Sequence, residues 1–194
     1  MKKITVKNLI SSLKKLGFKV FETGEYNLNL VGIRSKDETT NTFNDVLAVF
    51  FKNAGEWVLF QFPITTDPGQ FYLEHPLSVH GCAIVKPGQY PGLWTLGFHR
   101  AQYKALVQTG DVTVFRDNNQ DKVLDFENPQ TGRFGINLHR AAKAGESQVV
   151  HKWSAGCQVM ANPFDFDVLM SVCEKSASVW GNSFTYTLIN ETDL

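Results

Sequence analysis

A cysteine and a histidine in the second half of the chain are the pair of residue types that nucleophilic catalysis needs. Cys157 follows His139 by eighteen positions. Only the thiolate of a cysteine attacks a carbonyl carbon well, and an imidazole is a common base for removing the thiol proton. The separation allows a strand that ends on His139, a polar loop, and a returning segment that brings Cys157 opposite the imidazole. The pair therefore predicts acyl transfer through a thioester.

The residues directly before the cysteine predict a tight loop. Ser154, Ala155 and Gly156 all have small side chains. Small residues let the backbone turn sharply, so that its N–H groups can face the oxyanion that forms on a carbonyl under attack. We expect the N–H groups of Gly156 and Cys157 to stabilise this oxyanion.

The segment 134–160, FGINLHRAAKAGESQVVHKWSAGCQVM, resembles the catalytic signature of the L,D-transpeptidases, the YkuD-like family. That signature has a His, a spacer, and then Ser or Thr followed by His-Gly-Cys. In this chain fourteen residues separate His139 from Ser154, and Gly156-Cys157 follows in the matching place. The resemblance implies that Cys157 is the acyl-accepting nucleophile and that His139 is its base, held by a backbone carbonyl. It also implies that Ser154 and Gly156 shape the oxyanion site.

Three positions depart from the family pattern. Ala155 stands where the family has a second His, Arg140 replaces a small residue, and Val159 stands where Asn is frequent. The segment is also similar to variants of the signature in bacteriophage and prophage proteins. The departures leave two alternatives open. One is a catalytically inert virion or interaction module on the same scaffold, and the other is a cysteine peptidase or amidase with other substrates.

The resemblance implies that the substrate is a stem peptide of peptidoglycan, used by an L,D-transpeptidase or by a related carboxypeptidase or endopeptidase. Stem peptides carry carboxylates, which a guanidinium can clamp with two hydrogen bonds. We therefore expect Arg140 to bind substrate and Trp153, directly before the cysteine loop, to form a wall of the pocket. His99, at an expected strand-to-helix turn, is a further candidate to line the cleft.

The other cysteines and histidines are interpreted as structural residues. His80-Gly81-Cys82 imitates the end of the signature, but no His precedes it at the matching spacing and an apolar run follows it. Cys173 lies in an expected helix and is interpreted as a core residue. The remaining histidines show neither the His-x-His nor the His-Glu-x-x-His spacing typical of zinc sites. The sequence therefore predicts no metal site and no cofactor.

Composition narrows the class of protein further. The 194 residues are 43% hydrophobic, which suits one domain over residues 1–194 with residues 1–20 as an N-terminal helical appendage. Nineteen basic and nineteen acidic residues balance, so we expect neither a nucleic-acid partner nor a membrane partner. The sequence indicates neither a signal peptide nor a transmembrane helix. We therefore expect a protein that is cytoplasmic as made and that reaches a cell wall in a phage particle or at lysis.

The hydrophobic pattern predicts a mainly β domain, α+β in class, with about three helices. The resemblance implies a single β-sheet, sandwich or barrel-like, of the L,D-transpeptidase type, with these helices at its periphery. Pro163 after Asn162 marks the start of the last helix, whose inward face is expected to carry Phe164, Val168, Leu169 and Val172. The other expected helices cover residues 6–16 and 99–108. The expected strands include 28–33, a hairpin over 46–62, 134–138 and 184–189.

Overall fold

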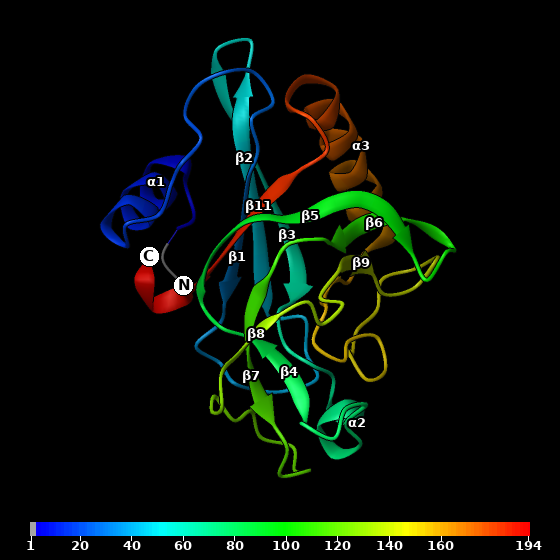
Figure 1. The fold of residues 1–194 in the computed structure, drawn as a ribbon. Helices are drawn as coiled ribbons and strands as arrows, with labels where there is room; N and C mark the ends of the chain where they lie inside the picture. Colours follow the sequence, from blue (N-terminus) through cyan, green and yellow to red (C-terminus); the bar gives the residue numbers. More distant parts are fainter. Residues whose placement is uncertain (1–2) are drawn as a thin grey trace.

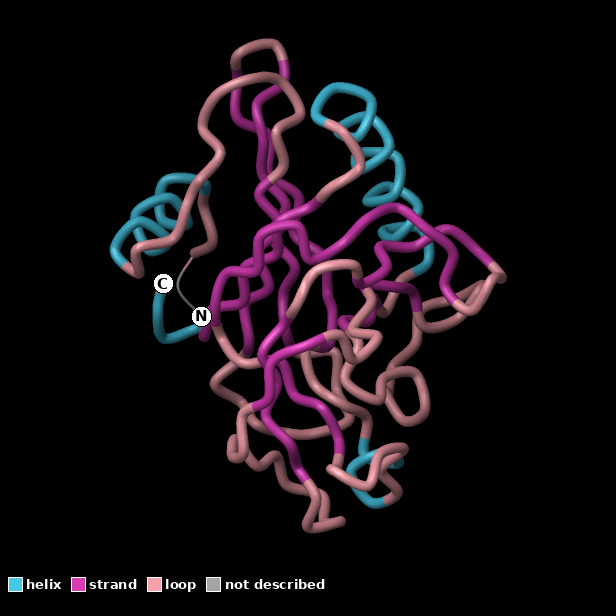
Figure 2. Tube along the Cα trace, viewed as in Figure 1, coloured by secondary structure: helices cyan, strands magenta, loops and turns pink. Residues whose placement is uncertain are grey.

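The computed structural model describes residues 3–194, and in this range the chain is mainly β (Figure 2). Eight strands close into a barrel in the order β1-β11-β5-β6-β9-β10-β3-β2 (Figure 1). The barrel strands are β1 (Asn29–Arg34), β2 (Asp45–Asn53), β3 (Glu56–Thr65), β5 (Gly88–His99), β6 (Tyr103–Gln108), β9 (Leu138–Arg140), β10 (Gln158–Met160) and β11 (Phe184–Asn190). The barrel-like expectation is thus confirmed at the level of a mainly β fold with a closed sheet.

A second, three-stranded sheet and the helices complete the described part of the chain, so the expectation of a single β-sheet is wrong. The small sheet has the order β4-β7-β8 and lies with α2 at the lower end of the molecule in Figure 1. Its strands are β4 (Cys82–Val85), β7 (Val112–Asp117) and β8 (Gln130–Gly132). The helices are α1 (Val6–Lys15), α2 (Gln70–Glu74), α3 (Pro163–Trp180) and the 3₁₀-helix η1 (Glu191–Asp193). None of the helices within residues 3–194 is long and apolar enough to cross a membrane.

The position of β2 in the fold explains why residues 46–51 are apolar without interruption. Successive side chains of a strand point to opposite faces. Leu47 and Val49 belong to the main core, whereas Ala48 and Phe50 belong to a second apolar cluster on the other face. Both faces of β2 are therefore covered, and the hairpin expected over 46–62 is confirmed as β2 and β3.

Helix α1 covers that second face. Thr5 caps the helix, because its side chain accepts a hydrogen bond from the Asn8 N–H at 3.1 Å. Leu9 and Leu13, one helical turn apart, are buried in the cluster that contains Phe50. The helix expected over 6–16 is confirmed in this way. Of the segment 1–20 that we expected to form an appendage, residues 1 and 2 lie outside the described residues.

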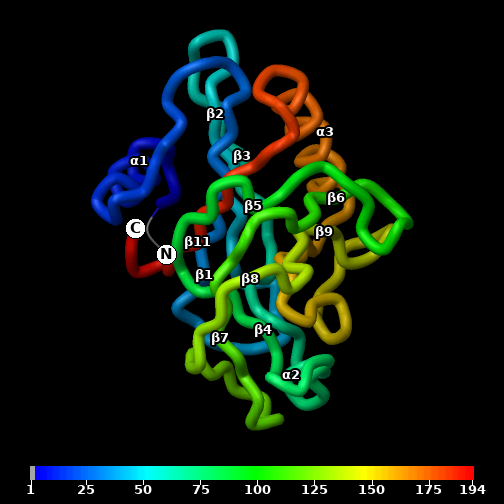
Figure 3. Tube along the Cα trace, in the orientation of Figure 1, coloured from blue at the N-terminus to red at the C-terminus, as the bar shows by residue number. Residues whose placement is uncertain are grey.

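The end of the chain returns to its beginning in the sheet. Strand β11 pairs with β1 in parallel and with β5 in antiparallel orientation. Figure 3 shows the red C-terminal strand between the blue and green strands that it joins. The strand expected over 184–189 is therefore confirmed, and it closes the barrel.

The helix expected over 99–108 is wrong. Strands β5 and β6 form an antiparallel hairpin here, with His99 paired to Tyr103. Arg100 and Ala101 make the turn with φ of 48° and 58°. Non-glycine residues seldom adopt this left-handed region, and the turn has no Asn-Gly or Asp-Gly signal, so local sequence did not indicate a hairpin.

Helix α3 begins where the sequence predicts. The Asn162 side chain accepts a hydrogen bond from the Phe164 N–H at 2.9 Å. The expected inward face is partly wrong, because Phe164 is 74% exposed and Val168 is 41% exposed. The buried face carries Leu169, as expected, together with Phe166, Met170 and Cys173, and it packs into the main core.

Candidate active site

Parallel pairing of β9 and β10 brings His139 and Cys157 into one region of the sheet. Val159 is the register partner of His139, and the Gln158 N–H donates to the Asn137 carbonyl at 2.9 Å. Cys157, directly before β10, therefore lies beside Asn137, two residues before the histidine. Side chains two residues apart on a strand share a face. By this register, Cys157 stands diagonally across the two strands from His139.

The strand that carries His139 differs from the expected one. We expected a strand over 134–138 that ends on His139, but β9 runs from Leu138 to Arg140 with His139 at its centre. Before β9, the backbone of residues 134–136 makes hydrogen bonds to a side chain instead of to a neighbouring strand. The N–H groups of Phe134 and Ile136 both donate to the Gln108 Oε1 atom, at 3.0 and 2.7 Å.

Cys157 is half-buried and lines a cavity of about 300 Å³. Its Sγ atom donates to the Gly135 carbonyl at 3.3 Å, and within residues 3–194 it makes no hydrogen bond to His139. Burial raises the pKa of the Cys157 thiol, and the Asn137 N–H and the Arg100 charge oppose this effect only in part. The free protein therefore holds a thiol rather than a thiolate at neutral pH.

Ser154 and Gly156 shape the loop before the cysteine. The Ser154 hydroxyl donates to the Cys157 carbonyl at 2.8 Å and accepts from the Gly156 N–H at 3.1 Å. Gly156 has a φ of 124°, and a Cβ atom there would lie 2.4 Å from the Ala83 carbonyl oxygen of β4. Only glycine fits this position. Our expectation that the Gly156 N–H faces an oxyanion is wrong, because Ser154 already accepts that N–H; the Cys157 N–H has no acceptor within the described residues.

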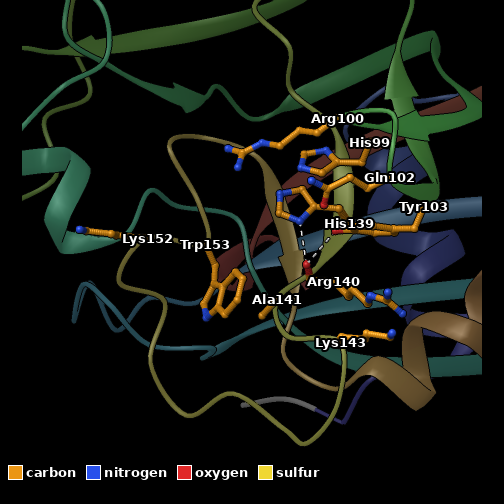
Figure 4. A pocket seen from close by; sticks show the side chains of 10 residues that line it. All are labelled: His99, Arg100, Gln102, Tyr103, His139, Arg140, Ala141, Lys143, Lys152 and Trp153. Atoms are coloured by element: carbon orange, nitrogen blue, oxygen red, sulfur yellow. Dashed lines mark hydrogen bonds between the residues drawn. The ribbon is translucent and has the colours of Figure 1, made fainter.

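His139 is 4% exposed and is held by its own strand. Its Nδ1 atom lies 2.8 Å from the Arg140 carbonyl oxygen, which also accepts from the Tyr103 hydroxyl at 3.3 Å (Figure 4). A carbonyl only accepts, so Nδ1 carries the proton and Nε2 keeps the lone pair of a base. Burial lowers the pKa of His139 to about 4, and the neighbouring His99 and Arg100 add to this effect. The imidazole is therefore neutral at pH 7.

His99, at the end of β5, lies closer to His139 than we expected. Its ring stacks on that of His139 with 4.1 Å between centroids and 25° between planes (Figure 4). The Asn137 side-chain nitrogen lies 3.2 Å from the His99 Nδ1 atom. Sequence reasoning missed Asn137, although its place two residues before His139 in an extended segment was a usable signal for a shared face.

A basic cavity opens on the other side of the two histidines. It measures about 480 Å³ and contains no carboxylate among its lining residues. Figure 4 shows the lining side chains, which are His99, Arg100, Gln102, Tyr103, His139, Arg140, Ala141, Lys143, Lys152 and Trp153. The three substrate-binding candidates, Arg140, Trp153 and His99, all line this cavity. Trp153 is 44% exposed, and the Arg140 guanidinium lies 4.4 Å from the centre of the Tyr103 ring.

The two cavities meet at the histidine pair. His99 and Arg100 line both of them, whereas Cys157 lines only the smaller one and His139 only the basic one. Within residues 3–194 no ion pair involves Arg100, Arg140, Lys143 or Lys152. Four positive charges without carboxylate partners favour an anionic ligand in the basic cavity.

The other two thiols are less accessible than Cys157. Cys82 is 3% exposed in β4, where burial raises its pKa to about 12. Cys173 is completely buried in α3, and burial raises its thiol pKa as well. Among the described residues, no group of three or more His, Cys, Asp or Glu side chains is placed to hold a metal ion.

No protein-family model, curated protein or solved structure matches this chain.

Proposed function

We propose that this protein transfers acyl groups of peptidoglycan stem peptides through a thioester on Cys157, as an enzyme of the L,D-transpeptidase type. The observation that carries the proposal is the β9–β10 register, which sets Cys157 beside Asn137 and diagonal to His139 at the junction of two cavities. The signature-like spacing in the sequence supports the same pair of residues.

The charge states of the free site favour general-base catalysis from a neutral pair. The pKa of the Cys157 thiol is raised and that of His139 is lowered to about 4. A standing thiolate–imidazolium pair is therefore disfavoured. The His139 Nε2 atom takes the thiol proton while Sγ bonds to the carbonyl carbon, and the Cys157 N–H donates to the oxyanion.

The remaining steps follow from the same two groups. The C–N bond of the substrate breaks while His139 returns its proton to the leaving amine, and a thioester remains on Cys157. An acceptor amine or a water molecule then attacks the thioester with His139 again as the base, and the sulfur leaves as the thiol. Transpeptidation and hydrolysis share this intermediate and differ only in the acceptor.

The basic cavity suits the substrate that the resemblance implies. Stem peptides carry free carboxylates, and Arg140 and Lys143 line the cavity beside His139. The exposed Trp153 ring offers an apolar wall next to these charges. For a protein similar to phage-encoded variants, remodelling or hydrolysis of the cell wall during infection is the activity that we favour.

The test is incubation of the protein with purified peptidoglycan fragments, followed by mass spectrometry of protein and products. We expect an acyl adduct on Cys157 and altered stem peptides with the wild type. Cys157→Ala should lose both, whereas Cys82→Ala, the matched thiol control, should keep both. Equal products from the wild type and Cys157→Ala, or none from either, would refute the proposal.

An inert interaction module is the second candidate. It is favoured by the bond of the Cys157 Sγ atom to the Gly135 carbonyl and by Ala155 in place of the family's second His. Alkylation rates of the three cysteines separate the two. A Cys157 rate that falls in His139→Ala supports the enzyme, and slow rates that are equal for all three thiols support the module. A cysteine peptidase or amidase would instead show itself on a panel of unrelated peptides and amides.

A further inference from the structure

The stacked histidine pair is the feature of the site that the proposed chemistry does not use. Acyl transfer needs one base, yet the structure places two imidazoles against each other at the junction of the cavities. His99 is 7% exposed and His139 is 4% exposed. Two buried rings from strands forty positions apart in the chain form a specific contact rather than a chance surface contact.

The proton of His99 is located by a chain of hydrogen bonds. The Asn137 side-chain oxygen accepts the Gln108 N–H at 2.8 Å, which fixes the orientation of the amide. The amide nitrogen, a donor only, therefore faces the His99 Nδ1 atom at 3.2 Å. His99 must accept this bond with a lone pair, so its proton lies on Nε2 and the ring is neutral.

The surroundings of both rings oppose a positive charge. The β5–β6 hairpin contributes Arg100 and the Tyr103 hydroxyl, and β9 contributes Arg140. The loop before β10 contributes the Cys157 thiol, Lys152 and Trp153, and Lys143 closes the basic side. The smaller cavity is also lined by Arg116 of β7 and by the Cys82 thiol of β4. Neither cavity has an Asp or Glu among its lining residues. An imidazolium at either position would meet cations and no carboxylate.

We propose that His99 is a positioning residue that covers one face of the His139 ring and, through Asn137, stays uncharged, so that His139 remains a neutral base in one fixed orientation. The inference rests on the proposed function for its catalytic meaning. Its physical content concerns only the free protein, because the stack, the Asn137 bond and the Arg140 bond require no substrate.

The test is an NMR titration of the imidazole C–H signals in the full chain carrying Cys157→Ala. His99→Ala uncovers His139, and the midpoint of His139 should rise by about 1–2 pH units toward the ordinary value. His99→Phe keeps an aromatic cover, and the midpoint of His139 should stay within about 0.5 units of the parent. An unchanged His139 midpoint in His99→Ala would overturn the proposal.

A second variant tests the role of Asn137 without changing either ring. Asn137→Asp keeps the acceptor for the Gln108 N–H but presents a carboxylate oxygen to His99. The midpoint of His99 should then rise by about 1 pH unit or more, and that of His139 should not rise. An unchanged His99 midpoint would contradict the assignment. This variant also decides the matter if His99→Ala does not fold.

The titrations need no turnover, so failure of the proposed acyl transfer would leave their result unaffected. If turnover is found, His99→Ala in a chain with Cys157 should lower kcat by about tenfold and leave KM within about twofold, because a base that is free to reorient loses part of its contribution to catalysis. Restoration of kcat in His99→Phe would support the covering role, and an unchanged kcat in His99→Ala would contradict it.

Discussion

At the scale of single residues, the chemistry of the candidate site depends more on the protonation states of Cys157 and His139 than on the presence of these two residue types. The same Cys–His pair works as an ion pair where cations or helix ends stabilise the thiolate. Here burial acts on both groups, raising the pKa of the Cys157 thiol and lowering that of His139 to about 4. The proton therefore remains on sulfur in the free protein at neutral pH.

The pH dependence of Cys157 reactivity tests this state. A base works only when it is unprotonated, so the acid limb of the reaction follows the pKa of His139. With that pKa at about 4, the limb should lie near pH 4 rather than near the ordinary pKa of histidine, and reactivity should persist as pH falls to about 5. The measurement is the rate of Cys157 alkylation against pH. A limb centred near pH 6.5 would contradict the buried, neutral base.

Gly156 is the residue whose replacement should disturb the loop most. An alanine there would combine a φ of 124° with a Cβ atom 2.4 Å from the Ala83 oxygen. We expect Gly156→Ala to lower the free energy of unfolding by more than about 1–3 kcal/mol, the usual cost of a strained residue. Gly145→Ala is the matched control, because its φ is 73° but no atom lies within 4 Å. If urea unfolding showed that Gly156→Ala and Gly145→Ala lower the free energy of unfolding equally, the contact with Ala83 of β4 would not explain the effect.

At the scale of elements, helices and hairpins differ in how locally they are encoded. Helix α3 has a cap, a proline at its first turn and a buried face, all within a short stretch of the chain. The β5–β6 hairpin has none of the usual turn residues, and it forms because β5 and β6 each pair with further strands of the barrel. Local signals therefore predict the helix and not the hairpin.

The cap of α3 gives the prediction at this scale. Asn162→Ala removes the acceptor of the Phe164 N–H and should lower the free energy of unfolding by about 1 kcal/mol. Asn162→Asp keeps an acceptor oxygen and should change it by only a few tenths, about 0.5 kcal/mol at most. Urea unfolding followed by tryptophan fluorescence measures both. Equal losses in the two variants would show that the cap is not the source of the stabilisation.

At the scale of the whole molecule, a buried polar network around Thr66, the residue after β3, ties the four strands β1, β2, β10 and β11 together. The Thr66 backbone and hydroxyl donate to Asp45 of β2, and the Thr66 carbonyl accepts from Arg34 of β1 and from Gln158 of β10. Gln158 in turn accepts the Tyr186 hydroxyl of β11 at 2.6 Å. The residue after Cys157 is therefore held by the closed barrel itself.

Arg34 neutralises this network. It pairs with Asp67 at 3.0 Å, with side chains only 6% and 15% exposed, and Asp45 lies nearby with its pKa raised to about 6 by burial and by the charge of Asp67. Arg34→Met should lower the free energy of unfolding at pH 7 by about 3–5 kcal/mol, because the Asp67 carboxylate loses its cation next to the buried Asp45. Lowering the pH from 7 toward 5 should recover part of the loss, since protonated Asp45 needs no partner.

A surface pair provides the control for Arg34. Lys14 and Glu22 lie 2.7 Å apart but are 55% and 39% exposed. Lys14→Met should therefore change stability by less than about 1 kcal/mol. If urea unfolding gave similar losses for Arg34→Met and Lys14→Met, burial would not be what makes the Arg34 pair important.

The sequence alone was enough for those features whose signal lies within a few neighbouring residues. It predicted α1 and α3 from their caps and periodicity, the β2–β3 hairpin from its apolar runs and turn, and the need for small residues before Cys157. It also singled out Cys157 and His139 by residue type and spacing. In each case, the interactions that decide the outcome join residues close together in the chain.

Only the tertiary structure decided how these residues are surrounded. Asn137 and the His99 stack, the loss of the Gly156 N–H to Ser154, and the neutral state of His139 all depend on burial and on which strands become neighbours in the barrel. His99 and His139 are forty positions apart, and they meet because β6 pairs with both β5 and β9. The spacing of residues along the chain does not predict such contacts, because they form only when the sheet closes.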